Sequence, residues 1–196
     1  IKHRKEKNFR NQNYTIPKYG KKILVNEANL FCDWYVKNNL SKLRKKRFCK
    51  NFKKIVKKLT LKLKLKDNIF VHRDFHVSNL MSVKNQIGLI DSQDALIGNK
   101  AYDLASLIDD VRLKTSYSFK EKIFKLYTKK QKNLDIKKFK NDFEILSVLR
   151  NLKIIGIFTR LALRDRKKNY LRLIPYTWQL INICLLYTSD AADDTP

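Results

Sequence analysis

One segment near the middle of the chain constrains the fold more than any other. Its apolar residues 69–71 lead to Asp74, Asn79 follows five positions later, and a second apolar run over 87–91 ends at Asp91. Short apolar runs bounded by polar residues are typical of buried strands. We therefore expect a strand over 69–71, a loop, and a short hairpin that returns at 87–91. This arrangement would bring Asp74, Asn79 and Asp91 close together at one site.

Two carboxylates and one carboxamide at this spacing are typical of phosphoryl transfer from ATP. In such sites one carboxylate accepts the proton of the attacking hydroxyl, while an amide oxygen and a second carboxylate hold the magnesium ion that neutralises the phosphates. The alternative is structural, because Asp and Asn also occupy turns and cap helices. The tripeptide His72-Arg73-Asp74 alone would be weak evidence, because three residues often match by chance. The longer pattern, which adds Asn79 and Asp91 at the right spacing, favours the catalytic interpretation.

Three stretches of the chain carry a family resemblance. Residues 90–107 (IDSQDALIGNKAYDLASL) resemble the aminoglycoside phosphotransferase and choline kinase superfamily. Residues 26–35 are similar to an E-x-x-L-F-x-x-W-Y helix, and residues 152–161 to an L-K-x-x-G-I-F-x-R-L helix, of one subgroup. That subgroup contains bacterial sugar kinases that phosphorylate the anomeric hydroxyl of N-acetylmuramate and N-acetylglucosamine in cell-wall recycling. The resemblance extends from about residue 16 to about residue 180.

The resemblance implies a role for each polar residue of the catalytic segment. Asp74 resembles the catalytic base, and Asn79 and Asp91 resemble the magnesium ligands. Asp103 resembles an Asp that braces the catalytic loop by accepting backbone hydrogen bonds, and it could also serve as an ordinary helix N-cap. The cofactors implied are ATP and Mg²⁺.

Three residues of the loop are expected to support it: His72, Arg73 and His76. Arg73 stands where many aminoglycoside kinases carry Gly, and the sugar-kinase subgroup resembles this chain in having Arg. His76 could orient the loop or touch substrate, although a buried structural His is the simpler interpretation. Ser92 departs from the aromatic residue that commonly follows the metal-binding Asp.

Two carboxylates outside the loop are candidates for substrate binding. Glu27 on the first expected helix could contact a sugar hydroxyl. Asp94 follows Asp91 by three residues and could approach metal or substrate, or it could be a solvated loop carboxylate. Trp34 on the same helix as Glu27 is expected to join the hydrophobic core with its aromatic neighbours and not to form a sugar platform.

The expected fold class is α+β, mainly α: the C-terminal lobe of a protein-kinase-like fold, with a small β insert around the catalytic loop. We expect residues 1–20 to be a basic polar leader left from a missing N-terminal lobe, 21–183 the phosphotransferase C-lobe, and 184–196 an adapter-derived tail that is not native. A fragment of this kind should be inactive alone. Helical periodicity predicts the following helices: 22–38, 46–65, 101–114, 118–130, 135–150, 151–164 and 168–182.

The net charge of +26 would suit a nucleic-acid-binding protein. However, Lys, Asn, Ile, Phe and Tyr are all abundant, and a genome rich in A and T explains this composition. Arg, which recognises phosphates and bases in bidentate fashion, is not enriched. The three cysteines form neither a disulfide framework nor a metal knuckle, and no apolar run reaches the roughly 18 residues of a membrane span. We expect a cytoplasmic protein with no membrane and no specific nucleic-acid partner.

These inferences predict an ATP-dependent phosphotransferase that acts on a small-molecule hydroxyl. The expected substrate is the anomeric hydroxyl of an N-acetylated amino sugar. One alternative is an aminoglycoside, choline or amino-alcohol kinase, although the basic chain favours a neutral or anionic sugar over these cations. The other alternative is a non-enzymatic basic protein that binds nucleic acid.

Overall fold

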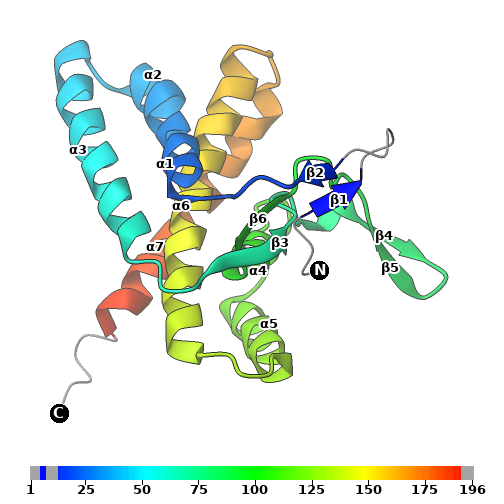
Figure 1. Ribbon diagram of the computed structural model, residues 1–196. Helices are drawn as coiled ribbons and strands as arrows, with labels where there is room; N and C mark the ends of the chain where they lie inside the picture. Colours follow the sequence, from blue (N-terminus) through cyan, green and yellow to red (C-terminus); the bar gives the residue numbers. More distant parts are fainter. Residues whose placement is uncertain (1–4, 8–12, 191–196) are drawn as a thin grey trace. The chain divides into compact units, whose positions relative to one another are not determined.

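The computed structural model describes residues 5–7 and 13–190 and divides the chain into two compact units (Figure 1). The first, called here the loop unit, comprises Ile1–Gly20 and Lys64–Phe143. The second, called the helical unit, comprises Lys21–Leu63 and Glu144–Pro196. All the residues expected to perform chemistry in the catalytic segment belong to the loop unit, so this unit is described first.

A pair of antiparallel strands forms the base of the loop unit. Strand β3 (Asp67–Val71) pairs with β6 (Leu96–Asn99). Val71 lies opposite Leu96, so the loop over 72–79, the predicted catalytic loop, begins where β6 also begins. Lys18 adds a parallel bridge to Ile97 on the other side of β6. The strand expected over 69–71 is therefore confirmed, whereas β6 is a strand that the sequence analysis missed.

Two hairpins complete the β structure of this unit (Figure 1). Strands β4 (Leu80–Val83) and β5 (Gln86–Leu89) pair in antiparallel register, which confirms the expected hairpin. Lys84 and Asn85 connect them with φ values of 46° and 62°, the left-handed conformation that tight two-residue hairpin turns require. Strands β1 (Lys5–Lys7) and β2 (Asn13–Thr15) form the second hairpin, within the segment expected to be a polar leader.

Helices make up most of the rest of the loop unit. They are α4 (Ala101–Ile108), α5 (Tyr117–Lys130) and the first part of α6 (Ile136–Leu163). The Ser116 side chain accepts a hydrogen bond from the N–H of Phe119 and so caps α5. Phe139 is fully buried against the rings of Phe124 and Tyr127.

The buried carboxylate of Asp142 connects three segments of the loop unit. It accepts hydrogen bonds from the backbone N–H groups of Lys64 and Leu65, each at 2.8 Å. The Asn99 side chain donates a third bond to it at 2.6 Å, and accepts one from the N–H of Ala101. Asp142 thereby fixes the approach to β3, the end of β6 and the start of α4, because buried backbone groups need partners.

The helical unit contains one long interrupted helix and its partners. Its elements are α1 (Lys21–Leu30), a π-helical turn (Phe31–Val36), α2 (Lys37–Asn39), α3 (Lys42–Leu61), the second part of α6, a 3-10 turn (Lys168–Leu173) and α7 (Ile174–Asp190). Phe31 lies at the centre of this core, with its ring 5.2–5.6 Å from those of Tyr35, Phe52 and Trp178. Trp34 beside it is half-buried.

The structure corrects several expected boundaries. The helices expected at 135–150 and 151–164 are one continuous helix, α6. The helix expected over 101–114 ends at Ile108, and 168–173 is a 3-10 turn that precedes α7. Residues 184–190 of the expected tail belong to α7, and residues 191–196 lie outside the described part of the chain.

The described part of the chain is mainly helical with small antiparallel sheets, which confirms the expected α+β, mainly α class. Within these residues, none of the helices combines the length and the apolar character needed to cross a membrane.

The close approach of α6 to α1 generates the first prediction. A Cβ atom on Gly156 would lie 2.6 Å from the backbone nitrogen of Phe31 and would overlap the Leu30 carbonyl. Gly156→Ala should therefore lower the free energy of unfolding by about 1–3 kcal/mol, since overpacking outweighs the gain in helix propensity. Urea unfolding followed by circular dichroism measures this.

Gly20→Ala is the matched control for that substitution, because a Cβ atom there meets nothing within 4 Å. It should change the free energy of unfolding by less than about 0.5 kcal/mol. An unfolding midpoint for Gly156→Ala equal to that of the control would contradict the close contact between the two helices.

Candidate functional site

The catalytic loop begins where β3 ends, and Asp103 of α4 holds its first residues. The N–H of His72 donates to Asp103 Oδ2 at 2.7 Å, and the N–H of Arg73 donates to Asp103 Oδ1 at 3.0 Å. Arg73 has a φ of 74°, a left-handed conformation that is costly for a residue with a side chain. One carboxylate thus binds the two consecutive N–H groups that lead into the strained residue, as the resemblance implied.

His72 links the loop to the strand that leads to Asp91. Its ring is buried, and Nε2 lies 3.0 Å from the carbonyl oxygen of Ile90. Because a carbonyl can only accept, Nε2 carries the proton in this contact. The imidazole therefore fixes the distance between the start of the loop and the residue directly before Asp91.

The side chain of Arg73 makes a second link of this kind. Its Nη1 donates to the carbonyl oxygen of Asp94 at 3.0 Å, and its guanidinium lies over the ring of Tyr19, 5.1 Å from the centroid. The contact with Asp94 is through the backbone, so the Asp94 carboxylate is left exposed to solvent. His72 and Arg73 thus connect the start of the loop to the carbonyl oxygens on either side of Asp91, those of Ile90 and Asp94.

Asn79 is oriented by its own hydrogen bonds. Its side-chain Nδ2 donates to the carbonyl oxygen of Asp74 at 2.9 Å, which leaves Oδ1 as the atom free to accept or ligate. Its backbone oxygen accepts from the N–H of Ile90 at 3.1 Å. Hydrogen bonds therefore link Asn79 to the backbone of Asp74 and to that of Ile90, the residue before Asp91, while the shared site of all three stays a prediction.

The two carboxylates expected to perform chemistry, on Asp74 and Asp91, are exposed. Asp91 has a φ of 67°, and its Oδ1 accepts a hydrogen bond from Gln93 Nε2 at 2.5 Å. The oxygen atoms of Asn79 and Asp91 suit Mg²⁺, which favours oxygen ligands and keeps several waters or phosphate oxygens. No group of three or more His, Cys, Asp or Glu side chains suited to a metal occurs among the described residues.

Asp110 is a residue of the site that the sequence analysis missed. Its carboxylate is buried, and its Oδ2 accepts the N–H of Val77, the first residue of the 3-10 turn Val77–Asn79. The signal that could have revealed it is an acidic pair, Asp109 and Asp110, directly after an apolar helix. Charged residues at such a position require partners when they are buried.

His76 and Glu27 differ in how the structure places them. His76 is half-buried, and its N–H donates to the carbonyl oxygen of Asp74 at 3.0 Å in a tight turn of the loop. Glu27 belongs to the helical unit, where its Oε2 lies 3.1 Å from Nζ of Lys153, with both side chains largely buried. A contact between Glu27 and a sugar hydroxyl stays a prediction.

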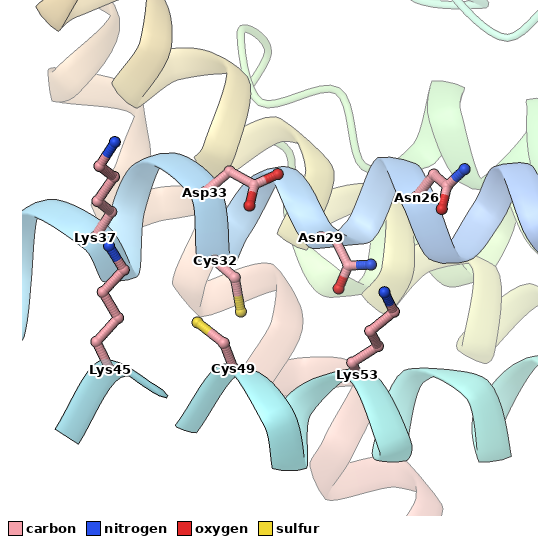
Figure 2. A pocket seen from close by; sticks show the side chains of 8 residues that line it. All are labelled: Asn26, Asn29, Cys32, Asp33, Lys37, Lys45, Cys49 and Lys53. Atoms are coloured by element: carbon pink, nitrogen blue, oxygen red, sulfur yellow. The ribbon is translucent and has the colours of Figure 1, made fainter. Parts of the chain in front are cut away.

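A polar hollow of about 610 Å³ lies in the helical unit between α1 and α3 (Figure 2). Figure 2 shows the sulfur atoms of Cys32 and Cys49 facing one another across it. Burial raises the pKa of the Cys32 thiol, and a hydrogen bond with Cys49 and repulsion from Asp33 add to this. The residues that line the hollow are Asn26, Asn29, Cys32, Asp33, Lys37, Lys45, Cys49 and Lys53.

The brace formed by Asp103 can be tested directly. In Asp103→Asn only one oxygen remains, so one backbone N–H of the pair on His72 and Arg73 loses its acceptor. The variant should lose about 1–3 kcal/mol of stability, and these two amides should exchange faster with deuterium. NMR-detected hydrogen exchange measures both amides. Glu121→Gln, on the exposed face of α5, is the control, and equal exchange in the two variants would exclude the brace.

The Cys32 thiol should be unreactive in the folded chain. A raised pKa keeps it protonated, so iodoacetamide at pH 8 should alkylate it at least about tenfold more slowly in buffer than in urea. A raised folded-state pKa stabilises the fold below the unfolded value of about 8.5, and this contribution is lost as pH rises. Peptide mass spectrometry gives the rate, and equal rates in buffer and urea would refute the expectation.

Comparison with curated proteins finds relatives that share a single function. An N-acetylmuramate/N-acetylglucosamine kinase of Neisseria meningitidis is 33% identical over 166 residues, which cover 82% of this chain and 50% of the relative. The kinase of the same name from Caulobacter vibrioides is 32% identical, covering 59% of this chain and 33% of the relative. That of Pseudomonas aeruginosa is 29% identical, covering 91% and 54%.

The chain thus spans about half the length of the curated relatives it matches, or less. The sequence model of the Phosphotransferase enzyme family matches residues 25–134. This range includes the catalytic loop, the β4–β5 hairpin and the Asp103 and Asp110 carboxylates that hold the loop, and it makes up more than half of the chain. The chain belongs to the Phosphotransferase enzyme family.

Proposed function

We propose that the full-length protein transfers the γ-phosphoryl group of ATP to a hydroxyl of an N-acetylated amino sugar, at the anomeric position. The observation that carries the proposal is a pair of hydrogen bonds: Asn79 Nδ2 donates to the carbonyl oxygen of Asp74, and the N–H of Ile90, the residue before Asp91, donates to the backbone oxygen of Asn79. These bonds support a site in which Asp74 would be the base and Asn79 and Asp91 the metal ligands. The names of the relatives, all N-acetylmuramate/N-acetylglucosamine kinases, support this class of substrate.

The mechanism assigns one step to each residue. Asp74 is exposed at the loop, where its carboxylate can orient a sugar hydroxyl and accept its proton during attack on the γ-phosphorus. Asn79 Oδ1 and the Asp91 carboxylate would hold Mg²⁺, which when bound neutralises charge on the β- and γ-phosphate oxygens. His72 and Asp103 hold the loop so that these groups need not reorganise.

The substrate class is also consistent with charge. Cationic acceptors such as aminoglycosides, choline or amino alcohols are repelled by the net charge of +26 on these 196 residues, whereas neutral or anionic sugars are not. The same positive field attracts ATP. We therefore favour an amino sugar over the cationic acceptors of the wider family.

The fold proposed for this chain is that of the C-terminal lobe of a protein-kinase-like enzyme. In such enzymes a separate N-terminal β-rich lobe covers the phosphates. Because this chain spans about half of its relatives, the proposed activity is that of the full-length protein, and the 196-residue chain alone should not turn over.

Phosphorus NMR of the full-length protein with Mg-ATP and N-acetylmuramate tests the proposal. A new sugar 1-phosphate signal is expected. Asp74→Asn should lower its rate of formation by about 10²–10⁴-fold, the usual contribution of a general base, and Asp91→Ala should abolish turnover. Glu121→Gln, remote from the loop in sequence and exposed on α5, should keep the full rate.

Two outcomes would contradict the proposal in different ways. A near-native rate in Asp74→Asn or Asp91→Ala would remove the assigned roles of these carboxylates. Intact ATP and no sugar phosphate with the unmodified protein would remove the amino sugar as substrate, and choline, aminoglycosides and amino alcohols would then be tested in the same assay.

A further inference from the structure

The turn that carries Asn79 is anchored from outside by a single charged acceptor. Val77 begins this 3-10 turn, and its N–H donates to Oδ2 of Asp110 at 3.0 Å. The first N–H groups of a helical turn have no partner inside the turn, so they need one elsewhere. Asp110, 1% exposed and located just after α4, supplies it.

The Asp110 carboxylate is itself held in a fixed orientation. Its Oδ1 accepts the backbone N–H of Arg112 at 3.1 Å and lies 3.4 Å from Nη1 of the same residue. Its Oδ2 is therefore directed to Val77. Hydrogen bonds to an ionised carboxylate are stronger than those between neutral groups, so this anchor resists displacement of the turn.

The anchor lies two residues from a metal ligand of the proposed site. Asn79 is connected to Asp74 through its side chain and to Ile90, next to Asp91, through its backbone. A shift of the turn at Val77 would therefore change the separation between Asn79 Oδ1 and the Asp91 carboxylate. Metal affinity depends on that separation, because Mg²⁺ tolerates little departure from octahedral geometry.

We propose that Asp110 is a positioning residue for the metal site: it sets the register of the Val77–Asn79 turn so that Asn79 and Asp91 bind one divalent cation together. The inference rests on the proposed function, since it presumes that these two residues ligate the metal. Asp110 would act without ligating the metal, because its two oxygens accept the N–H groups of Val77 and Arg112. Its role differs from that of Asp103, which holds the start of the loop and not the turn with the ligand.

The test uses the ¹⁵N-labelled 196-residue chain and Mn²⁺, whose paramagnetism broadens the amide signals of residues near the bound ion. The Mn²⁺ concentration that half-broadens the Asn79 and Asp91 amides is measured for the unmodified chain, Asp110→Ala and Asp110→Asn. We expect it to rise about tenfold in Asp110→Ala, the size of one lost bond to a charged acceptor. In Asp110→Asn, which keeps a neutral acceptor, we expect about threefold.

Asp142→Asn is the matched control. Asp142 is also a fully buried carboxylate of the loop unit that accepts backbone N–H groups, but its partners are Lys64 and Leu65. This variant should speed deuterium exchange at those two amides and leave the Mn²⁺ concentration within about twofold of the unmodified chain. Both Asp110 variants should instead speed exchange at Val77. If Asp110→Ala does not fold, Asp110→Asn still gives the comparison.

Each outcome decides the inference. Faster exchange at Val77 with an unchanged Mn²⁺ concentration, or an equal rise in Asp142→Asn, would show that Asp110 only stabilises the fold. No broadening near Asn79 and Asp91 in the unmodified chain would remove the metal site of the proposed function and this inference with it. The expected shifts, together with no sugar phosphate in the phosphorus NMR assay, would keep Asp110 as the positioning residue and reject only the proposed substrate.

Discussion

Hydrogen bonds from backbone N–H groups to carboxylates hold the loop unit together. Asp103 binds the first two residues of the catalytic loop, Asp110 binds the turn with Asn79, and Asp142 binds the segment that leads into β3. These segments lack the regular pairing of a helix or a sheet, so their N–H groups would otherwise be unsatisfied. The backbone that carries the exposed side chain of Asp74, and the turn that carries Asn79, thus depend on the carboxylates of Asp103 and Asp110.

Local patterns were sufficient to predict the strand before the loop, the β4–β5 hairpin and the clustering of Asp74 with Asn79. Those features depend on residues close together in the sequence, where apolar runs and turn residues determine the structure. Strand β6 and the role of Asp142 could not be predicted in this way. Asp142 binds residues 77 and 78 positions earlier in the chain, and a contact of that range leaves no periodic signal. The continuity of α6 was also missed: the expected boundary fell between Arg150 and Asn151, two polar residues that the structure buries inside one helix.

The backbone is strained at the two ends of the site. Arg73 and Asp91 both have φ near 70°, although neither is glycine. Such conformations persist where surrounding hydrogen bonds over-determine them, and they concentrate at functional sites. Here Asp103 holds Arg73. His72 and Asn79 both bind the backbone of Ile90, the residue directly before Asp91. The strain and the bonds that maintain it surround the predicted ligands and base.

The hydrogen bond between Ile90 and Asn79 closes the β4–β5 hairpin at its base, on the side of the loop. Beyond this closure every residue except the half-buried Leu80 and Gly88 is exposed, including the turn at Lys84 and Asn85. The hairpin can therefore lengthen, shorten or accept an inserted peptide tag at its tip without altering the spacing of the residues at its base. An experimenter can use that tip as an attachment point, because the hydrogen bonds at the base of the hairpin do not involve it.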